Sequence, residues 1–155
     1  LHIDSTNDIR GVEVLSVLKN IYAIFLGVVD AKYNSSNTRF MILTKAFSEV
    51  RVILKALGGS EDTLFLACGF GDLCLTSLND LSRNRTLGLL IGKGFYNSDY
   101  ERNPVILEGL NSISMIYKLV HKSHIDDLPI FSKLHSYFLG DYNALDFTFE
   151  ELVNI

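Results

Sequence analysis

The strongest constraint on the fold is a stretch that would be apolar on every side of a helix. Apolar residues fill most positions of Gly11–Ala31, so a helix over this range has no continuous polar face. Such a helix is enclosed by other elements or by lipid. Its longest apolar run, Ile21–Val29, follows Lys19 and Asn20 and precedes Asp30; it has about half the length that a bilayer requires. We therefore predict a central buried helix and no membrane span.

The rest of the chain is also helical in its periodicity, and this predicts an all-α multi-helix bundle in one domain, residues 1–155. Of the 155 residues 48% are hydrophobic, which is enough for a single core. A polar, irregular stretch is expected over Phe95–Pro104. Further helices are expected over Thr38–Leu57 (closed by Gly58 and Gly59), Ser60–Leu66, Asp72–Leu78, Arg83–Lys93, Gly109–Lys122, Leu128–Leu139 and Thr148–Val153.

The net charge and the cysteine and histidine content limit the kinds of ligand that the protein is expected to bind. The net charge of −4 disfavours a broad nucleic-acid surface. Cys68 and Cys74 have no partners at zinc-like spacing, and we expect buried or reduced thiols in a cytoplasmic protein. His121 and His124 lie three residues apart without an acidic or thiol partner, so no metal is expected.

The stretch Gly69–Arg85 gathers the polar residues that most resemble a binding site. It begins with a glycine turn, after which Asp72 occupies an N-cap position, and Ser82 is a second N-cap candidate. Arg83 then opens a helix, where the macrodipole disfavours cations. A helix N-terminus with guanidinium donors suits a phosphate or carboxylate. The alternative is a solvated, charged helix start.

Lys19 is the most informative single residue. Its neighbours three and four positions away on a helix are mostly apolar, so it has no solvated face of its own. Burial disfavours an ammonium ion, which suits a proton donor to a carbonyl oxygen undergoing reduction. The alternative is a lysine whose stem is buried and whose head reaches water.

Asp72 and Thr76 are four residues apart and share a helix face. Capping by Asp72 and a backbone hydrogen bond from Thr76 are compatible with a role in a pocket. We expect Asp30 to cap or pair, and Arg85 to lie at the surface. The Gly69–Gly71 turn is not a dinucleotide fingerprint, because no strand precedes it and the third glycine is missing.

Several blocks together resemble the C-terminal domain of NAD-dependent glycerol-3-phosphate dehydrogenase of bacterial type. The resemblance covers most of the chain, and its specific parts are GFGDLCLTS and LSRNR; GVEV, LKN and LEG (Leu107–Gly109) agree. It implies NAD(P)-dependent interconversion of dihydroxyacetone phosphate and sn-glycerol 3-phosphate, for glycerophospholipid synthesis in the cytoplasm. A homodimer is compatible with it.

The resemblance also assigns residues. Lys19 and Asp72 are the predicted catalytic residues: Lys19 matches the family's catalytic lysine, and the Asp72 match lines the substrate pocket. The family residue that matches Arg83 lies near both the cofactor and the substrate phosphate, and the one that matches Glu108 contacts the cofactor. From the sequence alone, Glu108 is an ordinary acidic residue at the start of a helix. The residues that the resemblance places at the substrate are Asn20, Thr76, Arg83 and Asn84.

The family's nicotinamide-binding Rossmann domain has no counterpart here, and the chain does not begin with Met. We expect that domain to precede Leu1, to bind most of the NAD or NADP, and to be needed for activity, so that this chain alone is inactive. After Asp30 the family is usually glycine-rich, whereas Ala31–Thr38 (AKYNSSNT) contains no glycine. The resemblance therefore does not predict the shape of this loop.

Two other functions compete with this one. They are a non-catalytic helical dimerisation or binding module, and the helical domain of a related hydroxy-acid dehydrogenase. Convergence of Lys19, Asp72, Thr76 and Arg83 on one cleft would favour an enzyme.

Overall fold

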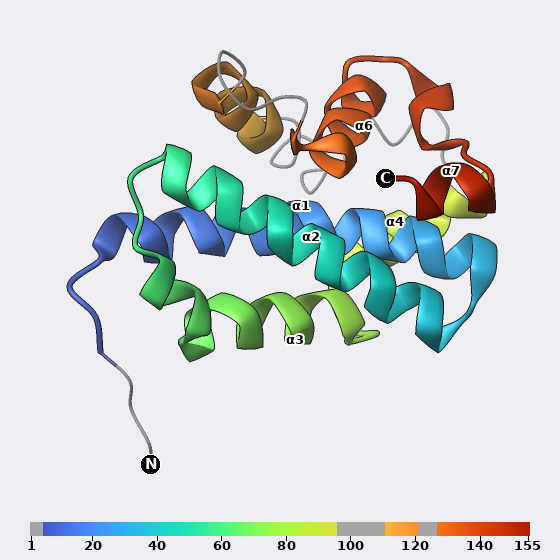
Figure 1. Cartoon of the computed structure of the whole chain (residues 1–155). Helices are drawn as coiled ribbons and strands as arrows, with labels where there is room; N and C mark the ends of the chain where they lie inside the picture. Colours follow the sequence, from blue (N-terminus) through green and yellow to red (C-terminus); the bar gives the residue numbers. More distant parts are fainter. Residues whose placement is uncertain (1–4, 96–110, 121–126) are drawn as a thin grey trace.

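The structure is a computed structural model that describes residues 5–95, 111–120 and 127–155; within these ranges every regular element is a helix, which confirms the predicted all-α class (Figure 1). Residues 111–120 form one helical segment, inside the predicted range Gly109–Lys122. The remaining elements are α1 (Ile9–Tyr33), α2 (Ser36–Ala56), η1 (Glu61–Phe65), η2 (Ala67–Gly71), α3 (Asp72–Leu78), α4 (Arg83–Gly92), α6 (Pro129–Phe138), η5 (Tyr142–Leu145) and α7 (Phe149–Val153).

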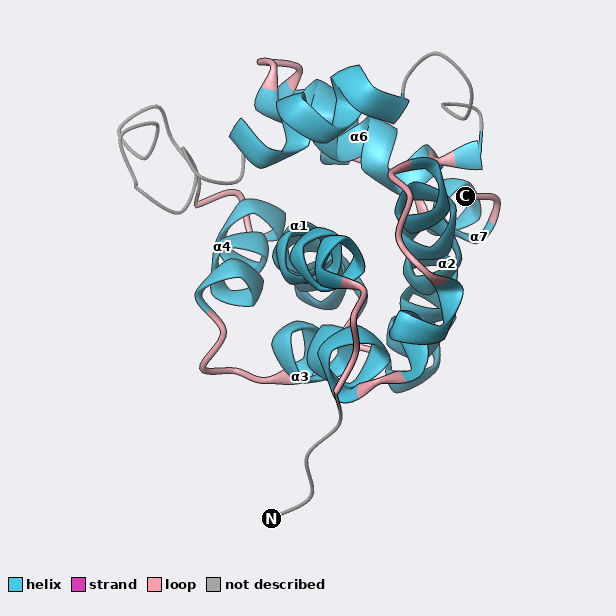
Figure 2. Cartoon of the chain, turned by 90° about the vertical axis from the view of Figure 1, so that its left-hand side faces the viewer, coloured by secondary structure: helices cyan, strands magenta, loops and turns pink. Residues whose placement is uncertain are grey.

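Helix α1 is the central element. Viewed nearly along its axis, it lies between α2, α3, α4 and α6 (Figure 2). All residues from Ile21 to Asp30 are buried, which confirms the predicted central helix. By length and composition alone α1 could cross a membrane, but 61% of its most apolar 18-residue window is buried inside the protein. It therefore has the character of a core helix.

The turn between α1 and α2 reverses the chain without a glycine. Asn34 ends α1 with φ 39° and ψ 44°, in the left-handed region that Asn tolerates better than most residues. Its backbone N–H donates to the carbonyl oxygen of Asp30, and the Ser35 side chain accepts from the N–H of Thr38 to cap α2. Asn34 thus supplies the backbone freedom that a glycine-rich loop would provide.

Two details between α2 and α3 differ from expectation. The predicted Ser60–Leu66 helix is a 3-10 helix, Glu61–Phe65, and the glycine turn is a π-helical turn broken at Gly69 (φ −94°, ψ −105°). A Cβ at Gly69 would lie 2.3 Å from the Leu64 carbonyl oxygen. Asp72 is consequently the first residue inside α3, and Gly71 holds the N-cap position. The prediction of a capping Asp72 is therefore wrong.

Helices α1 and α4 touch through their backbones. A Cβ on Gly88 would lie 2.0 Å from the Ile24 carbonyl oxygen, and one on Gly92 2.8 Å from that of Val28. Because Gly88 faces Ile24 and Gly92 faces Val28, the two helices run parallel. In the first turn of α4 the Arg85 carbonyl oxygen lies 2.3 Å from the position of a Cβ on Gly27 of α1.

A buried carboxylate joins three helices. Glu49 of α2 is 4% exposed and accepts hydrogen bonds from the Tyr22 hydroxyl (2.8 Å) and from the N–H groups of Ile130 (2.7 Å) and Phe131 (2.9 Å). No side chain near Leu128, the N-cap position of α6, caps this helix. Glu49 therefore caps α6 from a distant part of the chain and satisfies its free N–H groups.

The α1–α4 contact gives a stability prediction. Gly88→Ala should lower the free energy of unfolding by about 1–3 kcal/mol or more, because its methyl group meets backbone atoms that cannot move aside. Gly71→Ala is the matched control, since a Cβ there meets nothing within 4 Å and its φ of −59° is helical. Urea denaturation measures both; an equal loss in the two variants would contradict the close contact.

Glu49 gives a pH prediction. Burial raises the pKa of Glu49 to about 7 from 4.5, against hydrogen bonds that lower it. Between these values the folded state binds a proton that the unfolded state has lost, so stability should fall as pH rises through this window, by roughly 3 kcal/mol. Asp8, Glu61 and Asp146 do not titrate in this window, because hydrogen bonds lower the pKa of each carboxyl group below its ordinary value.

The Glu49→Gln variant tests this assignment. Its free energy of unfolding should change little from about pH 5 to about pH 7.5, whereas that of the unsubstituted protein falls. Glu150→Gln, on the exposed surface of α7, should retain the full pH dependence. The same slope in Glu49→Gln as in the unsubstituted protein would show that another group titrates.

Candidate active site

Lys19 and Asp72 form an ion pair that joins α1 to α3. The Lys19 Nζ donates to Oδ2 of Asp72, and the two side chains are 24% and 32% exposed. Lys19 therefore lies between the two predicted alternatives: its stem packs against the core, and its ammonium ion has a carboxylate partner and access to solvent. A partly exposed ammonium ion can donate a hydrogen bond to a bound molecule as well as to its carboxylate partner.

The neighbouring polar residues continue from this pair along α1 and α3. Thr76 follows Asp72 by one turn of α3 and is partly buried. Asn20 follows Lys19, and its side-chain amide donates to the carbonyl oxygen of Ser16 at 3.2 Å.

The first turn of α4 carries the predicted phosphate-binding residues. The Ser82 side chain accepts from the N–H of Arg85 at 3.3 Å, which confirms the predicted N-cap. Arg83 is exposed and Asn84 partly buried, and among the described residues Arg83 has no carboxylate partner. The Arg85 carbonyl oxygen of this turn lies against Gly27 of α1. This turn presents an exposed guanidinium group and backbone N–H groups, which suit an anionic ligand.

Arg85 does not lie at the surface, and that prediction is wrong. It is 6% exposed, and its Nη1 pairs with Oδ2 of Asp30. Its Nε lies 3.3 Å from Oδ1 of Asp80, and its Nη1 lies 3.4 Å from the Ser77 carbonyl oxygen. Asp30 also accepts from Nε of Arg39 at 2.7 and 2.9 Å, as the expectation that it pairs required. Of the two arginines in LSRNR, Arg85 therefore supports the fold, and Arg83 is exposed and open to a ligand.

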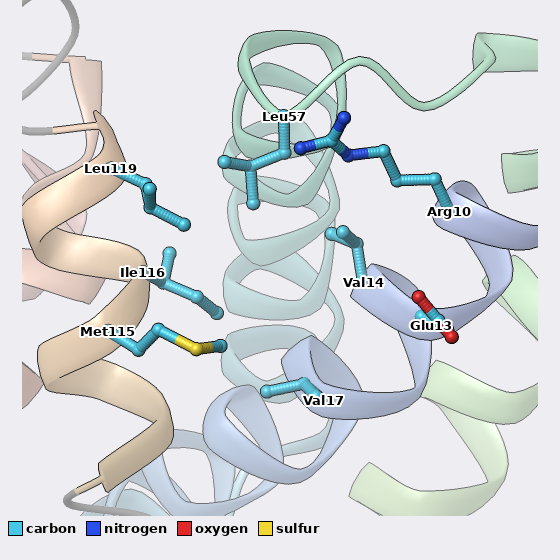
Figure 3. A pocket seen from close by; sticks show the side chains of 8 residues that line it. All are labelled: Arg10, Glu13, Val14, Val17, Leu57, Met115, Ile116 and Leu119. Atoms are coloured by element: carbon cyan, nitrogen blue, oxygen red, sulfur yellow. The ribbon is translucent and has the colours of Figure 1, made fainter.

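Two hollows lie away from Lys19. One, of about 260 Å³, is lined by Asp30, Arg39, Arg85 and Lys93, with Ala31, Asn34 and Leu89. The other, of about 180 Å³, is mainly apolar and lies between α1, the end of α2 and the helical segment 111–120 (Figure 3). Neither is lined by Lys19 or Asp72.

Comparison with known proteins identifies the family. The family model "NAD-dependent glycerol-3-phosphate dehydrogenase C-terminus" matches residues 8–148. The chain belongs to this family.

Individual relatives agree with this assignment. A glycerol-3-phosphate dehydrogenase [NAD(P)+] of Methanothermobacter thermautotrophicus is 42% identical over 118 residues, which are 76% of this chain and 36% of the relative. One of Clostridium botulinum is 36% identical over 127 residues, 81% and 38% of the two chains. The crystal structure of glycerol-3-phosphate dehydrogenase from Coxiella burnetii superposes with a TM-score of 0.80 at 29% identity, over 96% of this chain and 44% of that one. The chain thus spans less than half the length of these relatives.

The described part of this glycerol-3-phosphate dehydrogenase domain bears on how a dinucleotide could be bound. It contains no strand, and hence no βαβ unit of the kind that binds a whole dinucleotide. Arg83, exposed at the start of α4, is suited to a phosphate group of the cofactor or substrate. Glu108, the other predicted cofactor residue, lies outside the described residues, as do His121 and His124.

The sequence alone does not single out Glu49, and it places the buried Arg85 at the surface. Asp30 could have indicated that a cation such as Arg85 is buried, since an acid at the end of an apolar helix requires a cationic partner. Glu49 gives a weaker signal, because an acid within an amphipathic helix usually faces solvent.

Proposed function

We propose that this chain is the substrate-binding half of an NAD(P)-dependent glycerol-3-phosphate dehydrogenase, which interconverts dihydroxyacetone phosphate and sn-glycerol 3-phosphate. The observation that carries the proposal is the partly exposed Lys19–Asp72 ion pair, which joins two predicted site residues that are 53 positions apart in the chain. Membership of the family supports it.

In this proposal Lys19 is the proton donor. Its Nζ hydrogen-bonds to the C2 carbonyl oxygen of dihydroxyacetone phosphate and transfers a proton to that oxygen as C2 is reduced. Asp72 holds the ammonium group in place, while Asn20 and Thr76 hydrogen-bond to the substrate hydroxyl and carbonyl groups. Arg83 and Asn84 bind the phosphate. The bound NADH or NADPH supplies the hydride that C2 receives.

The other half of the site comes from a preceding Rossmann domain, which binds most of the cofactor. Arg83 and Glu108 complete the cofactor site from this side. The partial exposure of the Lys19–Asp72 pair is compatible with a site completed by another domain, and we propose that this chain alone has no turnover. The full protein acts in the cytoplasm as a homodimer, and its product serves glycerophospholipid synthesis.

Replacement of Lys19 tests the chemical step. In the full-length protein Lys19→Met should reduce kcat by about 10²–10⁴-fold, because the general acid is lost, while the thermal midpoint stays near that of the parent. Lys55→Met is the matched control: Lys55 is 56% exposed, pairs with Glu61 and should leave kcat unchanged. A Lys19→Met enzyme with near-parental kcat would show that Lys19 only supports the fold.

Replacement of Arg83 tests phosphate recognition. Loss of a charge-assisted hydrogen bond of about 1.5–3 kcal/mol corresponds to one to two decades in kcat/KM. The kcat/KM of the parent enzyme should fall strongly when dihydroxyacetone replaces dihydroxyacetone phosphate. The kcat/KM of Arg83→Ala is already low with the phosphorylated substrate and should fall little on the same replacement, because its phosphate contact is gone. Arg51→Ala, which removes an arginine paired with Glu61, should behave like the parent. Equal penalties in the parent and in Arg83→Ala would exclude contact between Arg83 and the phosphate.

A further inference from the structure

We propose that Arg85 is a positioning residue, which fixes the first turn of α4 so that Arg83 and Asn84 meet the substrate phosphate. This inference rests on the proposed function. Arg85 itself is buried and contacts no ligand in this proposal. It acts through the two residues that precede it.

The contacts of Arg85 join the elements that carry the candidate site. From the first turn of α4 its guanidinium group reaches Asp30 on α1, the Ser77 carbonyl oxygen on α3, and Asp80 in the turn between α3 and α4. Lys19 and Asn20 lie on α1, and Asp72 and Thr76 on α3. One buried side chain thus sets α4 relative to both helices that hold the other predicted site residues.

The geometry requires a guanidinium group. Asp30, Asp80 and Ser77 present three acceptors on three elements, and a planar guanidinium group can donate toward all of them from one position. An ammonium group at the end of a lysine is a compact point charge without this fork. Arg85→Lys would keep the charge and lose part of the geometry.

Charge balance alone does not explain Arg85. Asp30 already has a second cation, because Nε of Arg39 donates to both of its carboxylate oxygens. Arg39 lies on α2, which carries none of the predicted site residues. The two arginines share one carboxylate, and only Arg85 belongs to the helix turn that bears Arg83.

The backbone contact between α1 and α4 makes this turn sensitive to displacement. A Cβ on Gly27 would lie 2.3 Å from the Arg85 carbonyl oxygen, so α4 cannot move toward α1 at this point. A change in the side-chain contacts of Arg85 can therefore be absorbed only by tilting or unwinding the turn that carries Arg83 and Asn84. A displacement of about 1 Å can lower the rate of an enzyme by roughly a hundredfold.

The test measures kcat/KM of the full-length enzyme for dihydroxyacetone phosphate and for dihydroxyacetone. Arg85→Lys should lower the value for the phosphorylated substrate by roughly tenfold to a hundredfold and change the value for dihydroxyacetone little. Arg39→Lys is the matched control, since it alters the other partner of Asp30 and should leave the ratio of the two values unchanged. Thermal unfolding establishes that each variant is folded. If Arg85→Lys does not fold, Asp80→Asn replaces it, because Asp80 is 88% exposed, and it should shift the ratio in the same direction by less.

Two results would overturn the inference. An equal fall for both substrates would show that Arg85 supports the fold in general, and the same change of ratio in Arg39→Lys would show that the charge of Asp30 matters rather than α4. A parent enzyme without activity on dihydroxyacetone phosphate is a different failure: it would overturn the proposed function, and this inference with it.

Discussion

The enclosure of α1 is the constraint on which the rest of the structure depends. Because ten consecutive residues from Ile21 to Asp30 are buried, a polar side chain in this stretch must find a partner on a neighbouring element. Tyr22 donates to Glu49, and Asp30 accepts from Arg39 and Arg85. Just before the stretch, Lys19 pairs with Asp72. These contacts tie α1 to the helices around it, so the central helix orients its neighbours as well as covering their apolar faces.

The candidate site follows from this arrangement. Helices α3 and α4 both pack on α1, one held at Asp72 by Lys19 and the other held at Arg85 by Asp30. The residues proposed to meet the substrate lie near these two ion pairs, on the parts of the helices that the pairs fix. Catalytic groups need to be held in one geometry before the substrate arrives, and ties between rigid helices meet this need better than loops would.

Buried charges in this fold contribute geometry more than stability. A buried ion pair such as Asp30 with Arg85 recovers little more than the cost of removing two charges from water. Glu49 shows the same cost, since burial raises its pKa to about 7 although three groups donate to it. What each charge does is to define how helices meet: Glu49 sets α6 on α2, and Asp30 sets α4 on α1. We infer that Glu49 and Asp30 both contribute to the specificity of helix packing.

The sequence by itself determined the helices, the central helix among them, and most helix ends. These features depend on the 3.6-residue period and on local caps such as Ser35 and Ser82, and both are written within a few neighbouring positions. Only the tertiary structure decided which polar groups meet. Asp72, the partner of Lys19, lies 53 residues away in the chain, and Arg85, one of the two partners of Asp30, lies 55 residues away, so no local pattern contains these two pairs. Arg83 and Arg85 look alike in the sequence, and it is the close packing of α4 on α1 and α3 that buries one and leaves the other open to a ligand.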